Sequence, residues 1–64
     1  MIYAPVLHAD DLRLVTDAYA SEVERGQARR SALNYATAVY LQRHPFVAVG
    51  EARAMIRAAI GEHP

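Results

Sequence analysis

The chain has 64 residues, a formal net charge of zero and no cysteine, and all seven of its basic residues are arginines. This length allows one domain, and the missing cysteines exclude disulfides and thiolate metal sites. No apolar run is long enough to cross a membrane, and the start "MIYAPVLHADD" lacks the basic segment of a signal peptide, so we expect a cytoplasmic protein. A chain of this size buries only about 60% of its unfolded surface, which predicts marginal stability and favours a partner or a second copy.

Residues 1–7 are apolar and contain Pro5, which biases the preceding residue toward extended backbone. We expect a short extended N-terminal arm that packs on the helices. The residues leave an alternative open, in which this segment is an edge strand paired in an oligomer or with the apolar run "PFVAVG".

The first predicted helix covers about residues 10–25. Asp10 is a good N-cap, and both Asp10 and Asp11 suit the positive end of the helix dipole. Gly26 suits the left-handed position that follows a helix end. Four apolar residues at helical spacing predict one buried stripe: Leu12, Val15, Tyr19 and Val23.

The second predicted helix covers about residues 27–43 and ends before Pro45. Two apolar stripes run along it, one with Ala28, Ala32, Tyr35 and Val39, the other with Leu33, Ala36, Tyr40 and Leu41. Two stripes leave little polar surface, so this helix is predicted to be central and covered on two sides.

The third predicted helix covers about residues 50–60 and ends at Gly61, with an inner face that includes Ala52, Met55, Ile56, Ala59 and Ile60. The connector before it is expected to place Phe46 in the core. Three helices with short connections close most simply as a compact three-helix bundle. We therefore predict an all-α fold that forms a single domain over residues 1–64.

The charges are separated along the chain. Residues 1–24 hold five acids and one arginine, whereas residues 25–57 hold six arginines and one acid. Such a separation is typical of an interaction surface. The alternative is that the two halves pair with each other within the fold.

The stretch "RGQARRS" concentrates three arginines, one of them Arg25, beside Gly26. If the second helix begins at residue 27 or 28, Arg29 and Arg30 lie in its first turn, where free backbone amides and two guanidinium groups favour a phosphate or a carboxylate. The alternatives are that the first helix runs on past Gly26, that Ser31 is the true N-cap, or that the arginines are simply solvated in a turn.

Arg53 and Arg57 are four residues apart on one face of the third helix. Like charges at this spacing repel unless an anion lies between them. Glu22, Glu24 or an anion from another molecule could lie there. Five residues are therefore predicted to bind a partner or an anion: Arg25, Arg29, Arg30, Arg53 and Arg57.

No arrangement of residues indicates catalysis or metal binding. His8, His44 and His63 are isolated, no nucleophile stands beside a base, and so small a bundle lacks room for a deep pocket. We expect no enzymatic activity, no cofactor and no small-molecule substrate. A helix-turn-helix reader of DNA is disfavoured because the connector after residue 43 is long and the chain is not basic overall.

These features predict a small non-enzymatic protein-protein interaction or regulatory module that binds an acidic partner surface through its arginines. Self-association is expected because the core is small. Two alternatives stay open: a nucleic-acid-binding transcriptional regulator that places the same arginines on phosphates, and a structural subunit of a homo-oligomer. The arginine-only cations and many alanines are typical of GC-rich coding, and we expect a bacterial origin.

Overall fold

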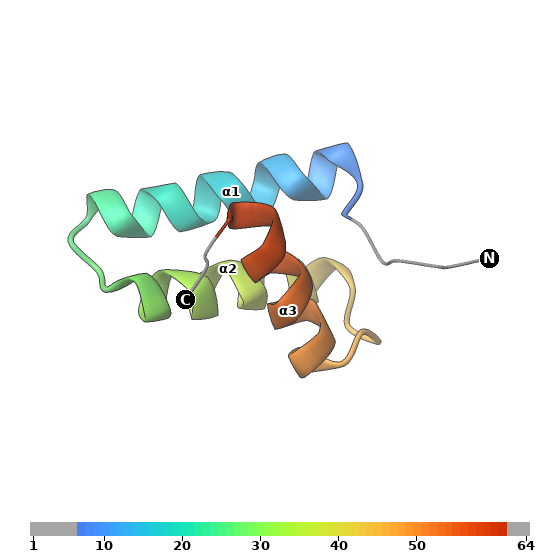
Figure 1. Ribbon diagram of the computed structural model, residues 1–64. Coiled ribbons are helices and arrows are strands. Elements are labelled where there is room, and N and C mark those ends of the chain that lie inside the picture. The colour runs from blue at the N-terminus through green and yellow to red at the C-terminus, as the bar shows by residue number, and fades with distance from the viewer. Residues whose placement is uncertain (1–6, 62–64) are drawn as a thin grey trace.

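The computed structural model describes residues 7–61, and this part of the chain contains three α-helices. They are α1 (Ala9–Glu24), α2 (Arg29–Arg43) and α3 (Val49–Ile60). Figure 1 shows α1 and α2 side by side in opposite directions, with α3 packed across both. The predicted all-α three-helix bundle is thus confirmed, and residues 7–61 contain no strand. The predicted N-terminal arm lies outside the described residues except for Leu7, which packs against the core.

The ends of α1 are set by the backbone rather than by a capping side chain. His8 is the N-cap and makes no side-chain capping bond, so the prediction that Asp10 is the N-cap is wrong. At the other end, Gly26 has a φ of +89° as expected. Its amide donates to the carbonyl of Val23, and the Gln27 amide donates to that of Glu22. This pair of bonds is the Schellman arrangement that turns the chain toward α2.

The buried face of α1 is rotated from the predicted stripe. Val15 is fully buried as expected, but Leu12 and Val23 are exposed. Asp11 is buried instead, one turn before Val15, and Ala18 packs against the core from the next turn. The rotation brings the Asp11 carboxylate toward the end of α2, where its ion-pair partners lie.

The central helix α2 is continuous and begins at Arg29, after the N-cap Ala28. The alternative N-cap at Ser31 is therefore wrong. α2 contacts both other helices, as predicted, but the stripe through Tyr35 and Val39 is not covered. Tyr35 is 47% exposed and Val39 is half-buried, because α1 and α3 pack on neighbouring sides of α2 and leave its third side open.

The core is small and contains several alanines. Its residues come from all three helices: Val15, Leu33, Ala36, Tyr40, Ala52 and Ile56. Ala32 is also fully buried. Alanine has no side chain beyond Cβ, so these positions allow the helix backbones to approach closely. Met55 and Ile60 extend this core on the inner side of α3, whereas Ala59, predicted to face inward, is exposed.

In the connection between α2 and α3, the residue that packs on the core is not the one predicted from the sequence. Phe46 was expected in the core, yet it is 100% exposed. Val47 packs against the core in its place. The Val47 amide donates to the carbonyl of His44 at 3.2 Å, and this tight turn directs Val47 inward while Phe46 points away from the bundle.

Candidate partner-binding surface

Two of the arginines form ion pairs within the described part of the chain. Nη1 of Arg25 lies 3.2 Å from Oε2 of Glu22, one turn earlier in the chain. Nε of Arg43 lies 3.5 Å from Oδ1 of Asp11 on α1. Arg25, which the sequence analysis placed in the binding cluster, is therefore held against the end of α1.

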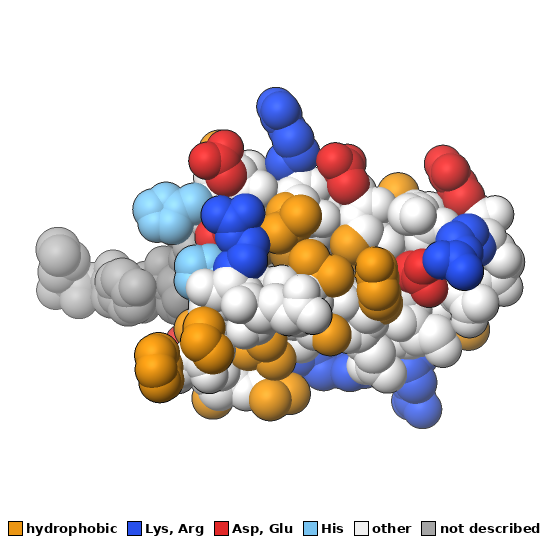
Figure 2. Space-filling view, turned by 180° about the vertical axis from the view of Figure 1, so that it is seen from behind, with side chains coloured by type: hydrophobic (Ala, Val, Ile, Leu, Met, Phe, Trp, Pro, Cys, Tyr) orange, Lys and Arg blue, Asp and Glu red, His pale blue; other side chains and the backbone are white. Residues whose placement is uncertain are grey.

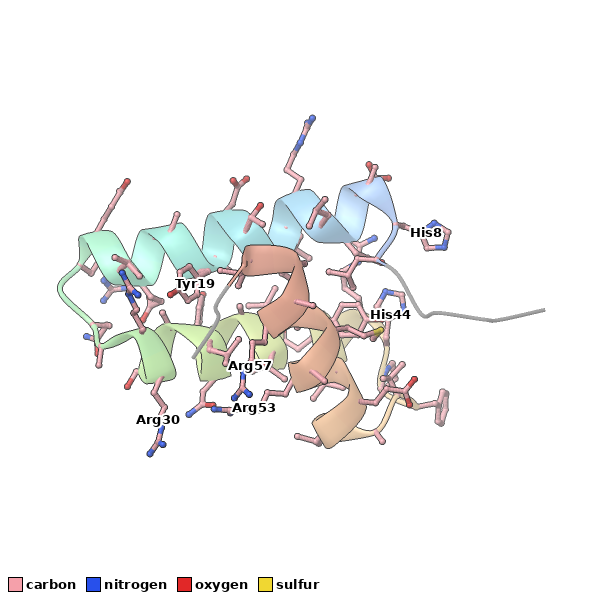
Figure 3. The ribbon with its side chains drawn as sticks, viewed as in Figure 1. His8, Tyr19, Arg30, His44, Arg53 and Arg57 are labelled. Carbon is pink, nitrogen blue, oxygen red and sulfur yellow. The ribbon has the colours of Figure 1, made fainter. Side chains whose placement is uncertain are left out.

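Three of the predicted site residues lie along one edge of the bundle, formed by α2 and α3. Arg30 comes from the first turn of α2, and Arg53 and Arg57 come from successive turns of α3 (Figure 3). Nη1 of Arg53 donates a hydrogen bond to Oδ1 of Asn34. Because Asn34 is one helical turn beyond Arg30, this bond ties the α2 and α3 parts of the surface together. We call Arg30, Asn34, Arg53 and Arg57 the arginine edge.

No acidic side chain of residues 7–61 forms an ion pair with Arg30, Arg53 or Arg57. From the sequence, Glu22 or Glu24 was one of the anions expected to fit between Arg53 and Arg57. In the structure Glu22 instead pairs with Arg25. Within residues 7–61, the arginine edge therefore holds three cations whose only side-chain bond between α2 and α3 is the one from Arg53 to the neutral amide of Asn34.

Arg29 is exposed at the first position of α2. It follows the N-cap directly, and the helical rotation of about 100° per residue turns it away from the direction of Arg30. The five predicted site residues are thus divided by the fold. Arg30, Arg53 and Arg57 share one edge, and Arg25 is paired in the turn.

The acids of the first half of the chain lie on a different edge. Asp10, Asp17 and Glu24 are spaced by seven residues, so they line one side of α1, and all three are exposed. Figure 2 shows acidic side chains along the α1 edge, together with a basic side chain, and further arginines on the opposite edge. The separation of charge along the sequence therefore largely persists in space. In the described residues, the two halves pair through the ion pairs of Asp11 and through the Arg25–Glu22 pair next to the turn.

Asp11 organises a polar cluster that the sequence analysis missed. Only 6% of its side chain is exposed, and its Oδ2 lies 2.9 Å from Nε2 of His44. The His44 ring stacks on that of Tyr40 with centroids 4.5 Å apart. With Arg43, these residues join the start of α1 to the end of α2. The one signal in the sequence is that Asp11 stands four residues before the buried Val15, at core spacing.

An apolar patch lies where α2 connects to α3. Phe46 is fully exposed and Val49, the first residue of α3, is 64% exposed. Figure 2 shows apolar side chains gathered at this end of the molecule, beside the edge that carries arginines. The other exposed large apolar residues, Leu12, Val23 and Tyr35, come from α1 and α2.

Among residues 7–61, no group of three His, Asp or Glu side chains is arranged to hold a metal ion. His8 is exposed at the start of α1, His44 belongs to the Asp11 cluster, and His63 lies outside the described residues. No helix in the described range is both long enough and apolar enough to cross a membrane.

No protein-family model matches the chain, and no curated protein and no solved structure matches it either.

Proposed function

We propose that this protein is a small non-enzymatic interaction module that binds an acidic segment of a partner protein through the arginine edge. The observation that carries the proposal is that Arg30, Arg53 and Arg57 share one edge without an acidic counterpart in the described residues. Guanidinium groups suit this role because their planar fork binds a carboxylate with two parallel hydrogen bonds.

The positions of these arginines slightly destabilise the helices when no anion is bound. Arg53 and Arg57 repel each other at a spacing of four residues, at a cost of about 0.2–0.5 kcal/mol. Arg30 lies in the first turn of α2, where the helix dipole disfavours a cation by a similar amount. A carboxylate bound between these groups relieves both costs. This supports the assignment of the surface to an anionic partner.

A protein partner is favoured over a nucleic acid by the charge on the rest of the molecule. The net charge is zero, and the exposed acids Asp10, Asp17 and Glu24 give α1 an acidic edge. Long-range attraction to a duplex is therefore weak. A local contact with a few carboxylates needs only the arginine edge.

A binding assay with defined probes tests the proposal. The probes are a helical peptide rich in glutamate and a short DNA duplex, both at low salt, and the variants replace Arg53 and Arg57 together by glutamine. Arg13→Gln is the matched control, because Arg13 is exposed on α1 and has no ion pair in the described residues. We expect the double variant to lose most of the affinity for the peptide and the control to keep it. Equal affinity in all three proteins, or binding to the duplex alone, would reject the proposal.

A second candidate is self-association, in which another copy of the chain supplies the acids. It is supported by the opposite placement of the α1 acids and the arginine edge on a molecule with zero net charge. Charge reversal tests it directly. Arg53→Glu with Arg57→Glu leaves two acidic edges, Asp17→Arg with Glu24→Arg leaves two basic ones, and only the mixture of these variants should associate in sedimentation at low salt.

A further inference from the structure

The arginine edge continues into the apolar patch at the start of α3. Val49, Arg53 and Arg57 are separated by four residues each, so their side chains form one row along the helix, with about 6 Å of rise between neighbours. Phe46 lies three residues before Val49, at the same end of the row. Along α3 the surface is therefore apolar at Val49 and cationic at Arg53 and Arg57.

The fold does not need Phe46 at this position. Val47 fills the inward place in the connection, and Phe46 makes no contribution to the buried core. A fully exposed phenylalanine beside an exposed valine is available to a second molecule. Aromatic residues and arginine are the types most enriched where binding energy concentrates at protein interfaces.

We propose that Phe46 and Val49 form the apolar end of the arginine edge, and that the combined surface binds an acidic amphipathic helix of a partner protein. The partner helix carries an apolar side chain at one end and carboxylates one and two turns away. This inference rests on the proposed function, because the carboxylates are those that Arg53 and Arg57 bind.

Charge and desolvation fix the order of the partner's residues. A carboxylate placed against Phe46 and Val49 would lose water without gaining a hydrogen-bond donor, which disfavours it there. An apolar side chain placed opposite Arg53 would leave that guanidinium without a carboxylate, and its repulsion from Arg57 would be less well neutralised. The partner helix therefore needs an apolar side chain opposite Phe46 and Val49 and carboxylates opposite Arg53 and Arg57. These three positions of the partner are spaced by four residues, as on α3.

Two helical peptides of identical composition test this order. One carries leucine, glutamate and glutamate at successive spacings of four residues, and the other carries glutamate, leucine and glutamate at the same positions. Reversing a peptide end to end does not convert one pattern into the other. By fluorescence anisotropy at low salt, we expect the first peptide to bind about tenfold more tightly, as burial of one apolar side chain provides.

The variant Phe46→Ser with Val49→Ser should weaken binding of the ordered peptide, because its leucine loses the apolar contact. It should not weaken the permuted peptide, so the difference in affinity between the two peptides should become smaller. Both residues are exposed, so the variant keeps its fold, which circular dichroism checks. Tyr35→Ser is the matched control, because Tyr35 is an exposed aromatic residue on the uncovered side of α2. This control should bind both peptides as the parent does.

The results distinguish a failure of the apolar end of the surface from a failure of the proposed function. If both peptides bind equally, and only Arg53→Gln with Arg57→Gln weakens them, the apolar end is wrong while the proposed function stands. If the arginine variant weakens neither peptide, both are wrong. If Phe46→Ser with Val49→Ser abolishes self-association of the chain without changing the peptide preference, the patch serves a second copy and the inference is overturned.

Discussion

Nε2 of His44 lies 2.9 Å from Oδ2 of Asp11, and this contact joins the end of α2 to the first turn of α1 across 33 positions of the chain. Because a carboxylate only accepts hydrogen bonds, His44 is the donor. The second carboxylate oxygen of Asp11 has no hydrogen-bond partner and faces Nε of Arg43 at 3.5 Å. The contact closes the end of the bundle that lies far from the turn at Gly26.

Asp11→Asn should therefore destabilise the fold. The substitution removes the charge that Arg43 and His44 face, and we expect a loss of about 1–2 kcal/mol in the free energy of unfolding, since both partners are partly exposed. Urea unfolding measures it. Asp17→Asn is the control, because Asp17 is exposed on the same helix and its substitution should change stability by no more than about 0.5 kcal/mol. Equal midpoints for the two variants would show that the Asp11 cluster is not stabilising.

Substitution by alanine at Gly26 and at Gly50 should change the stability of the fold in opposite directions. Gly26 has a φ of +89°, and an added Cβ there would meet nothing within 4 Å, so Gly26→Ala should cost about 1 kcal/mol through the backbone alone. Gly50 is helical, and a Cβ there also meets nothing within 4 Å, so Gly50→Ala should stabilise by about 0.4–1 kcal/mol. Thermal unfolding of both variants checks the pair. A shift of the same sign in both would contradict the turn described at Gly26.

The exposed Phe46 gives a third prediction. Phe46→Ser should leave the free energy of unfolding within about 0.5 kcal/mol of the parent, because the ring touches no core residue. Ile56→Val, which removes one methyl group from a fully buried side chain, should cost about 0.5–1.5 kcal/mol. A larger loss for Phe46→Ser than for Ile56→Val in urea unfolding would place Phe46 in the core after all.

The sequence predicted the helices better than the faces they bury. Periodicity and the glycines at 26 and 61 placed all three helices within two residues of the observed ends. The faces were harder, because alanine is common throughout and gives no direction. Tyr35 was predicted to be buried from its spacing to Ala32 and Val39, but which sides of α2 are covered depends on where α1 and α3 pack.

Local spacing also could not reveal contacts between distant segments. In the sequence, Asp11 looks like an ordinary acidic residue in the first turn of a helix. Only the tertiary fold brings His44 next to it. Similarly, Phe46 is the largest apolar residue of its connector, yet the turn between His44 and Val47 places Val47 against the core. The arginine edge was predicted in part. Its α3 half follows from helical spacing, whereas its link to α2 through Asn34 needed the fold.

Arg30 should show a conflict between stability and binding. Arg30→Glu replaces a cation by an anion in the first turn of α2, which has no acidic residue, and the helix dipole should then stabilise the fold by about 0.5–1 kcal/mol. The same substitution should weaken binding of an acidic helical peptide. Unfolding and anisotropy titrations on one preparation measure both effects. Higher stability with unchanged peptide affinity would remove Arg30 from the binding surface.

Nuclear magnetic resonance of the ¹⁵N-labelled protein tests partner binding at the arginine edge most directly. On titration with an acidic helical peptide at low salt, we expect the resonances of Asn34, Arg53 and Arg57, including the guanidinium Nε signals, to shift and saturate together. Arg13 on α1 should not respond, and added salt should reverse the shifts because the contact is between exposed charges. Shifts absent from α3, or spread evenly over every arginine, would contradict a binding surface at this edge.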